Sequence, residues 1–237
     1  MIRYRSTFAI LCHFVMYSAL IVTACKERPE TNEGLAKYYL PADVLGEHGT
    51  DYIYRSKSDT NLPPEIWRHI QTSEGHITSI NYDHNQQVVQ KQYERMVGNG
   101  VLIDSLHLYF YDDSGRTITL PVKILSPNRF PFDAVDSTKI YLTHLEWVQP
   151  GDLLHVILER RRQFMGDTTW NWNGKTLPAI RFNVQDKFET EQVGWTTSGW
   201  KGEEIYAKDL GLVYYRRNIS ENMVLEFELN ERRPVVN

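Results

Sequence analysis

Residues 223–230 read Met-Val-Leu-Glu-Phe-Glu-Leu-Asn, an alternation with a period of two residues. The apolar members on one side are Met223, Leu225, Phe227 and Leu229. Successive side chains of a β-strand point to opposite faces of the sheet, so this stretch predicts a strand with one face on a core and the other in water.

The same alternation recurs toward the N-terminus, in residues 180–188 and 106–111, and turn residues separate the alternating segments. We expect an all-β fold, a curled antiparallel meander of eight to eleven strands that forms a half-barrel or barrel, with few or short helices, because long twisted sheets do not stay open. The turn candidates are Asn99-Gly100, Asp113-Ser114-Gly115, Asn173-Gly174 and Asp209-Leu210-Gly211.

Two segments are ambiguous. Residues 88–97 also fit a helical face, but the Asn99-Gly100 dipeptide that follows favours a strand in a hairpin. Residues 63–67 could begin a short helix or a strand, and residues 126–131 suggest a bend. No composition break divides the chain, so we expect a single β-rich domain over residues 37–233.

The first 24 residues have the organisation of a signal peptide: Arg3 and Arg5, then a mostly apolar stretch over residues 8–22. This stretch ends in Val-Thr-Ala-Cys at residues 22–25, which resembles the bacterial lipobox. The resemblance implies cleavage after Ala24 and lipidation of Cys25 with acyl chains such as palmitate, an anchor to a membrane. The alternative is an uncleaved transmembrane anchor, for which the stretch falls short of the roughly 20 apolar residues a span needs.

Residues 25–36 are then the lipidated cysteine and a polar, flexible tether. Lys26 follows the cysteine where an Asp would, by resemblance to Gram-negative lipoprotein sorting, signal retention in the inner membrane. We therefore expect a cell-envelope protein of the outer membrane. Whether it faces the periplasm or the cell surface is left open.

Composition excludes several classes of function. The net charge is −4, and −6 once the leader is removed, which argues against a nucleic-acid partner. Cys12 and Cys25 are the two cysteines, both at the N-terminus, so the domain has no disulfide, CxxC pair or cysteine zinc site.

The sequence carries no phosphate-binding Gly loop, HExxH, GxSxG or SxxK motif, and its histidines are scattered. We therefore expect a non-enzymatic protein with no catalytic residue, no cofactor and no metal. Glu203 and Glu204 are adjacent, so alternation places them on opposite faces and not in one site. The same alternation splits Arg160-Arg161-Arg162 across two faces, which we interpret as a solvated strand end.

Trp170 and Trp172 lie two residues apart beside the Asn173-Gly174 turn. On a strand both rings share one face, where they could stack on sugar rings or, alternatively, cover a core.

Residues 199–215, with a Trp/Gly-rich strand, Tyr-Ala, a Gly turn and Gly-Leu-Val, resemble the closing hairpin of uncharacterised Bacteroidota lipoproteins, and residues 38–41 and 52–54 resemble their opening strands. Such relatives are similar to the LolA/LolB lipoprotein carriers, which implies a curled antiparallel sheet with an apolar groove.

Three hypotheses follow. The first is a non-enzymatic binding or scaffold module, holding an acyl or other apolar ligand or docking an envelope protein. The second is a glycan-binding lipoprotein that uses Trp170 and Trp172. The third is an envelope hydrolase, which would need a nucleophile such as Ser105 with a distant His and Asp.

Overall fold

The computed structural model describes residues 34–236, apart from 42–44, 47, 113, 134–135 and 192. The leader, Cys25 and most of the predicted tether lie outside the described residues. Among the described residues, no helix is long and apolar enough to cross a membrane. The elements are η1, a 3-10 helix (Ala36–Tyr38), and the strands β1 (Thr50–Ser56), β2 (Glu65–Ser73), β3 (His76–Tyr82), β4 (Val88–Val97), β5 (Gly100–Tyr111), β6 (Thr117–Pro121), β7 (Lys123–Pro131), β8 (Ile140–Val148), β9 (His155–Trp172), β10 (Lys175–Glu191), β11 (Trp195–Ala207), β12 (Gly211–Ser220) and β13 (Met223–Pro234).

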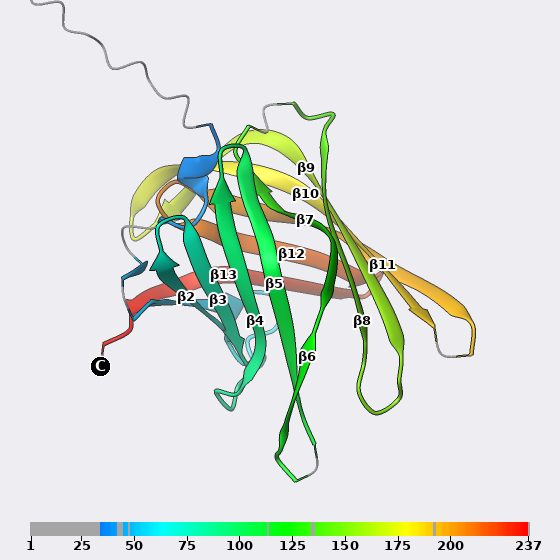
Figure 1. Cartoon of the computed structure of the whole chain (residues 1–237). Helices are drawn as coiled ribbons and strands as arrows, with labels where there is room; N and C mark the ends of the chain where they lie inside the picture. The colour runs from blue at the N-terminus through cyan, green and yellow to red at the C-terminus, as the bar shows by residue number, and fades with distance from the viewer. Residues whose placement is uncertain are drawn as a thin grey trace, which may run out of the picture. The chain divides into compact units, whose positions relative to one another are not determined.

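The strands form one antiparallel sheet that closes into a barrel (Figure 1). Neighbours in sequence pair along most of the sheet, as the meander predicts. β1 also pairs with β13, and β4 pairs with β5, so twelve strands close the ring while β6 extends β5 outside it. The all-β barrel prediction is confirmed, but the expected eight to eleven strands were too few.

The predicted hairpins form, with one change. Asn173 and Gly174 turn between β9 and β10 with φ of 50° and 76°, the left-handed conformation that Asn and Gly tolerate. Between β4 and β5, however, the pair Val97–Gly100 closes the ladder, so the turn lies one residue earlier than Asn99-Gly100. Gly100 is required there for space, because a Cβ would lie 2.5 Å from a backbone oxygen of β7.

Both ambiguous segments are strands, β4 and β2. The expected bend at residues 126–131 is instead the second half of β7, and here the prediction was wrong. Two register irregularities let this proline-containing strand stay in the sheet, since proline is tolerated at bulges. One of these bulges leaves Arg129 between the paired residues Asn128 and Phe130.

The chain that leads into β1 closes one end of the barrel, and we call residues 34–41 the plug segment. Leu35 and Tyr39 are buried within it. Leu35 N–H donates to Phe132 O (2.7 Å), and Asp209 N–H donates to Lys37 O (3.1 Å). Leu35, assigned by sequence to the tether, therefore belongs to the core.

The main core lies next to the plug segment, and a smaller one lies along β5 and β8 and includes Val122, between β6 and β7. Tyr39, Phe130, Phe182 and Tyr206 form an aromatic group at the centre of the main core, with ring centroids 4.8–5.8 Å apart. The smaller cluster comprises Ile103, Leu106, Val122 and Leu145.

Candidate functional site

A cavity of about 360 Å³ lies inside the barrel, and we call it the lumen cavity. Tyr39 and Tyr206 line its buried end, beside the plug segment. Glu65, the first residue of β2, and Leu225, near the start of β13, line it at the opposite end and are partly exposed. Its volume falls in the range of about 300–1,000 Å³ typical of small-molecule sites.

One side of the lumen cavity is apolar and aromatic. The Tyr215 ring stacks on Phe227 with centroids 5.3 Å apart and lies 6.0 Å from the Tyr54 ring. We call this side the aromatic wall. Its members are Tyr54, Trp67, Leu212, Tyr215, Leu225 and Phe227.

The other side is polar and centred on Glu94, which is 2% exposed. Its carboxylate accepts hydrogen bonds from Tyr39 Oη (2.8 Å), from Ser79 Oγ (3.4 Å) and from Gln92 Nε2. Arg129 Nε adds a fourth contact, also of 3.4 Å. A buried carboxylate is costly unless it is paired and hydrogen-bonded, and Glu94 has both kinds of partner.

Two further buried ion pairs lie across the strands beside this group. Arg162 Nε donates to Glu204 Oε2 (2.8 Å), and Arg160 holds Asp186 with two hydrogen bonds of 2.6 and 2.7 Å. Burial acts to raise the pKa of the Glu204 carboxyl, but the charges of Arg162 and Arg160 outweigh it and hold that pKa well below its usual range. Both acids are therefore ionised at neutral pH.

Two arginines of the lumen cavity have few partners of their own. Arg217 lies 3.5 Å from Asp186 and 3.8 Å from Glu204, and it donates no hydrogen bond to another described residue. Among the residues that the structure describes, Arg129 donates only the 3.4 Å contact to Glu94. A guanidinium carries five N–H donors, so most of the donors of these two side chains are free to bind something in the cavity.

Ser79 and His69 form a pair that resembles a nucleophile and its base, with Ser79 Oγ 2.8 Å from His69 Nδ1. The hydroxyl, however, also donates to Glu94 (3.4 Å), and in that arrangement Ser79 accepts from His69 Nδ1 in the tautomer that carries its proton there. Burial and the nearby Arg129 lower the pKa of His69 to about 3. A general base works best with a pKa near the operating pH, so this pair is poorly suited to hydrolysis.

His69 makes stability pH-dependent in a defined window. Its pKa falls from about 6.5 in the unfolded chain to about 3 in the barrel, so the unfolded state binds the proton first and stability drops as the pH falls below 6.5. We predict a loss approaching about 1.4 kcal/mol per pH unit between pH 6 and 5. Urea unfolding of the wild type and His69→Gln across this range should show the slope in the wild type only.

His84→Gln, at an exposed turn, is the matched control and should keep the wild-type slope. The acids Asp186 and Glu204 add their own pH dependence only nearer the unfolded carboxyl pKa values of about 4. Parallel curves for the wild type and His69→Gln between pH 6.5 and 5 would contradict the assignment.

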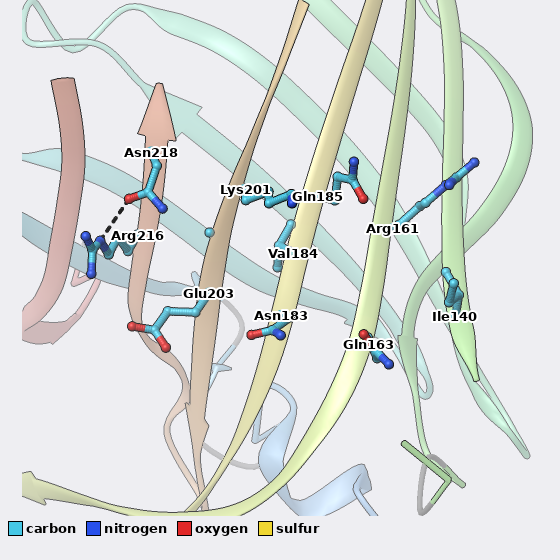
Figure 2. A pocket seen from close by; sticks show the side chains of 11 residues that line it. Ile140, Arg161, Gln163, Asn183, Val184, Gln185, Lys201, Glu203, Arg216 and Asn218 are labelled. Carbon is cyan, nitrogen blue, oxygen red and sulfur yellow. Dashed lines mark hydrogen bonds between the residues drawn. The ribbon is translucent and has the colours of Figure 1, made fainter. Parts of the chain in front are cut away.

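The outer surface of β8 to β12 carries a second hollow, of about 480 Å³ (Figure 2). Asn183, Gln185 and Glu203 extend from neighbouring strands there, and Arg216 Nε donates to Asn218 Oδ1 (3.0 Å). Most of its lining side chains are exposed. This hollow is a solvated polar face, and the lumen cavity, with its buried charges, is the stronger candidate.

The structure separates the residues that sequence analysis selected. Cys25 lies outside the described residues. Trp170 and Trp172 are half-buried and pack against the main core, and the Trp170 ring lies 6.0 Å from Tyr214. Sugar stacking by these two rings stays a prediction. Ser105 pairs with Tyr93 in the β4–β5 ladder and has no histidine partner among the hydrogen bonds of the described residues.

The interpretation of Arg160-Arg161-Arg162 was half right. Alternation does split them: Arg161 is exposed, whereas Arg162 is 1% exposed and Arg160 is held by buried Asp186. They are not a solvated strand end, because the acids that pair with them come from β10 and β11. Glu203 and Glu204 do lie on opposite faces, with Glu204 2% exposed inside.

Sequence analysis missed the charged residues of the lumen, although a signal was present. Asp186 follows Ile180, Phe182 and Val184 with the same period of two, so it occupies a core-facing position. Arg217 likewise lies two residues after Tyr215. A charge at a core-facing position of a strand needs a buried partner or a ligand.

Together, the fold and the cavity define the class: a closed antiparallel β-barrel with a partly charged internal cavity. No family profile and no curated protein matches the chain. Among solved structures, it is similar to a candidate lipoprotein from Parabacteroides distasonis ATCC 8503, with 12% identity, a TM-score of 0.48, and coverage of 80% of this chain and 94% of that one.

Proposed function

We propose that the protein is a non-enzymatic binding module of the cell envelope that holds a small ligand with an apolar part in its lumen cavity. The observation that carries the proposal is the cavity itself, which has an aromatic wall facing a polar side inside a closed barrel. Small-molecule sites combine such apolar linings with a few convergent polar groups. A filled interior would have ruled the ligand hypothesis out.

The resemblance of residues 22–25 to a lipobox supports attachment to a membrane through lipid on Cys25, with the outer membrane of a Gram-negative bacterium as the expected location. The contact of Ser79 Oγ with the Glu94 carboxylate and the low pKa of His69 support a binding role over hydrolysis. No specific observation favours the glycan hypothesis over the cavity.

The test is native mass spectrometry with lipid extraction on residues 26–237, since residues 33–237 form one compact unit. Purified from a Gram-negative host, the protein should carry an amphiphile at close to one molecule per chain. Trp67→Ala in the aromatic wall should reduce occupancy at least several-fold, whereas Trp195→Ala, at the exposed start of β11, should not. A clean apo mass for the wild type would contradict the proposal and direct work to glycan arrays and partner pull-downs.

A further inference from the structure

The arginines inside the barrel, Arg129, Arg160, Arg162 and Arg217, differ in how close a carboxylate lies to each guanidinium. Arg160 and Arg162 each have a carboxylate at 2.6–2.8 Å, so their charges are compensated within the protein. Arg217 has none closer than 3.5 Å and Arg129 none closer than 3.4 Å. Buried charges are normally paired and hydrogen-bonded, so the two loosely held side chains are the exceptions that need an explanation.

Both of these side chains line the lumen cavity, and the exposed fractions of the side chains are 19% for Arg217 and 23% for Arg129. Arg129 is the extra residue of the bulge in β7, and β-bulges often change the direction in which a side chain points. Arg217 lies over the Tyr215 ring, 4.8 Å from its centroid, and so joins the aromatic wall to the polar side.

The carboxylates near these two arginines already have other, closer partners. Glu94 already accepts from four side chains, and Asp186 and Glu204 are held closely by Arg160 and Arg162. The remaining one, Glu65, lies at the partly exposed end of the cavity.

We propose that Arg217 and Arg129 bind the anionic headgroup of an amphiphile, a carboxylate or a phosphate, while the aromatic wall contacts its hydrocarbon part. The inference rests on the proposed function and names the class of ligand. Guanidinium groups recognise carboxylate and phosphate oxygens through paired N–H donors. Burial of Arg217 and, second, the charge of Arg160 lower the pKa of Arg217, and the charge of an anion beside it would offset both effects.

The experiment is calorimetric titration of the full-length protein in phosphatidylcholine nanodiscs, with empty nanodiscs as the blank. Four probes are compared: octanoate, octyl phosphate, octanamide and inorganic phosphate. We expect octanoate or octyl phosphate to bind at least tenfold more tightly than neutral octanamide, and the ratio between these two distinguishes a carboxylate from a phosphate headgroup. Inorganic phosphate should bind weakly. If it bound as tightly as octyl phosphate, the proposal that the ligand is an amphiphile would be contradicted.

Arg217→Gln and Arg129→Gln should each reduce the affinity for the anionic probe at least tenfold and leave octanamide unaffected. Arg216→Gln is the matched control, since the neighbouring residue points to the outer surface (Figure 2). Arg217→Gln should also unfold at a urea concentration no lower than that of the wild type, because it removes a charge that the protein without ligand compensates poorly. If the role of Arg217 were purely structural, the substitution would lower this urea concentration.

Equal affinities for the three octyl probes, unchanged by either substitution, would overturn the headgroup assignment and leave the proposed binding function standing. If none of the three binds, both proposals fail.

Discussion

Replacing Glu204 with Gln should lower the free energy of unfolding by about 3–5 kcal/mol, because it leaves the Arg162 guanidinium buried without its counter-charge. Arg162 is 1% exposed and Glu204 2% exposed, so water cannot replace the lost partner. The substitution also weakens the acceptor of the Tyr206 hydroxyl, which donates to Glu204 over 2.8 Å. Urea unfolding followed by tryptophan fluorescence measures the change.

The control is Glu203→Gln, one residue away on the outer face, which should change stability by less than about 0.5 kcal/mol. The double substitution Arg162→Met with Glu204→Leu should recover most of the loss, since a buried pair can often be exchanged for apolar residues at little cost. A loss below about 1 kcal/mol for Glu204→Gln would mean that this ion pair is hydrated and not buried.

Phe130→Ala should destabilise the protein by a similar amount, about 3–5 kcal/mol, as expected for removing a buried aromatic ring. Phe130 is 2% exposed, and its ring contacts Tyr39 of the plug segment (5.1 Å), Tyr206 (4.8 Å) and Phe182 (5.7 Å). The substitution therefore opens a cavity where the plug segment meets β7, β10 and β11.

We expect two readouts for Phe130→Ala: a lower urea midpoint, and faster amide hydrogen exchange in the plug segment than in β9 and β10. Leu125→Ala on the same strand is the control, because its side chain is 47% exposed and should contribute little. Unchanged exchange in the plug segment would show that this segment is held by its backbone hydrogen bonds and not by the Phe130 ring.

The strand pattern and most turns could be predicted because they depend on neighbouring residues. The alternation in residues 223–230 places Phe227 and Leu229 on the core side, where they are 5% and 2% exposed. Asn173-Gly174 turns because these residues tolerate positive φ. The Asn99-Gly100 turn shifted because the position of Gly100 is decided by the close approach of β7, which is distant in sequence.

The candidate site could not be predicted, because its residues are partners only across distant strands. Glu94 and Arg129 are 35 residues apart, and Arg162 and Glu204 are 42 apart. Read singly, Arg160 and Arg162 looked like solvated charges. The sequence alone indicates that Asp186 occupies a core-facing position, but it does not indicate which cation pairs with it.

The amino-acid sequence by itself therefore determined the all-β class, the meander and the face to which each strand turns its side chains, since period and turn chemistry are local. Tertiary structure decided the closure of β1 on β13, the plug segment and the lumen cavity. The physical reason is geometric, because the diameter of a barrel grows with its number of strands. A ring of twelve strands is too wide for its inward side chains to fill completely. The inward positions, which a smaller barrel would pack with apolar groups, here enclose paired charges and a space for a ligand.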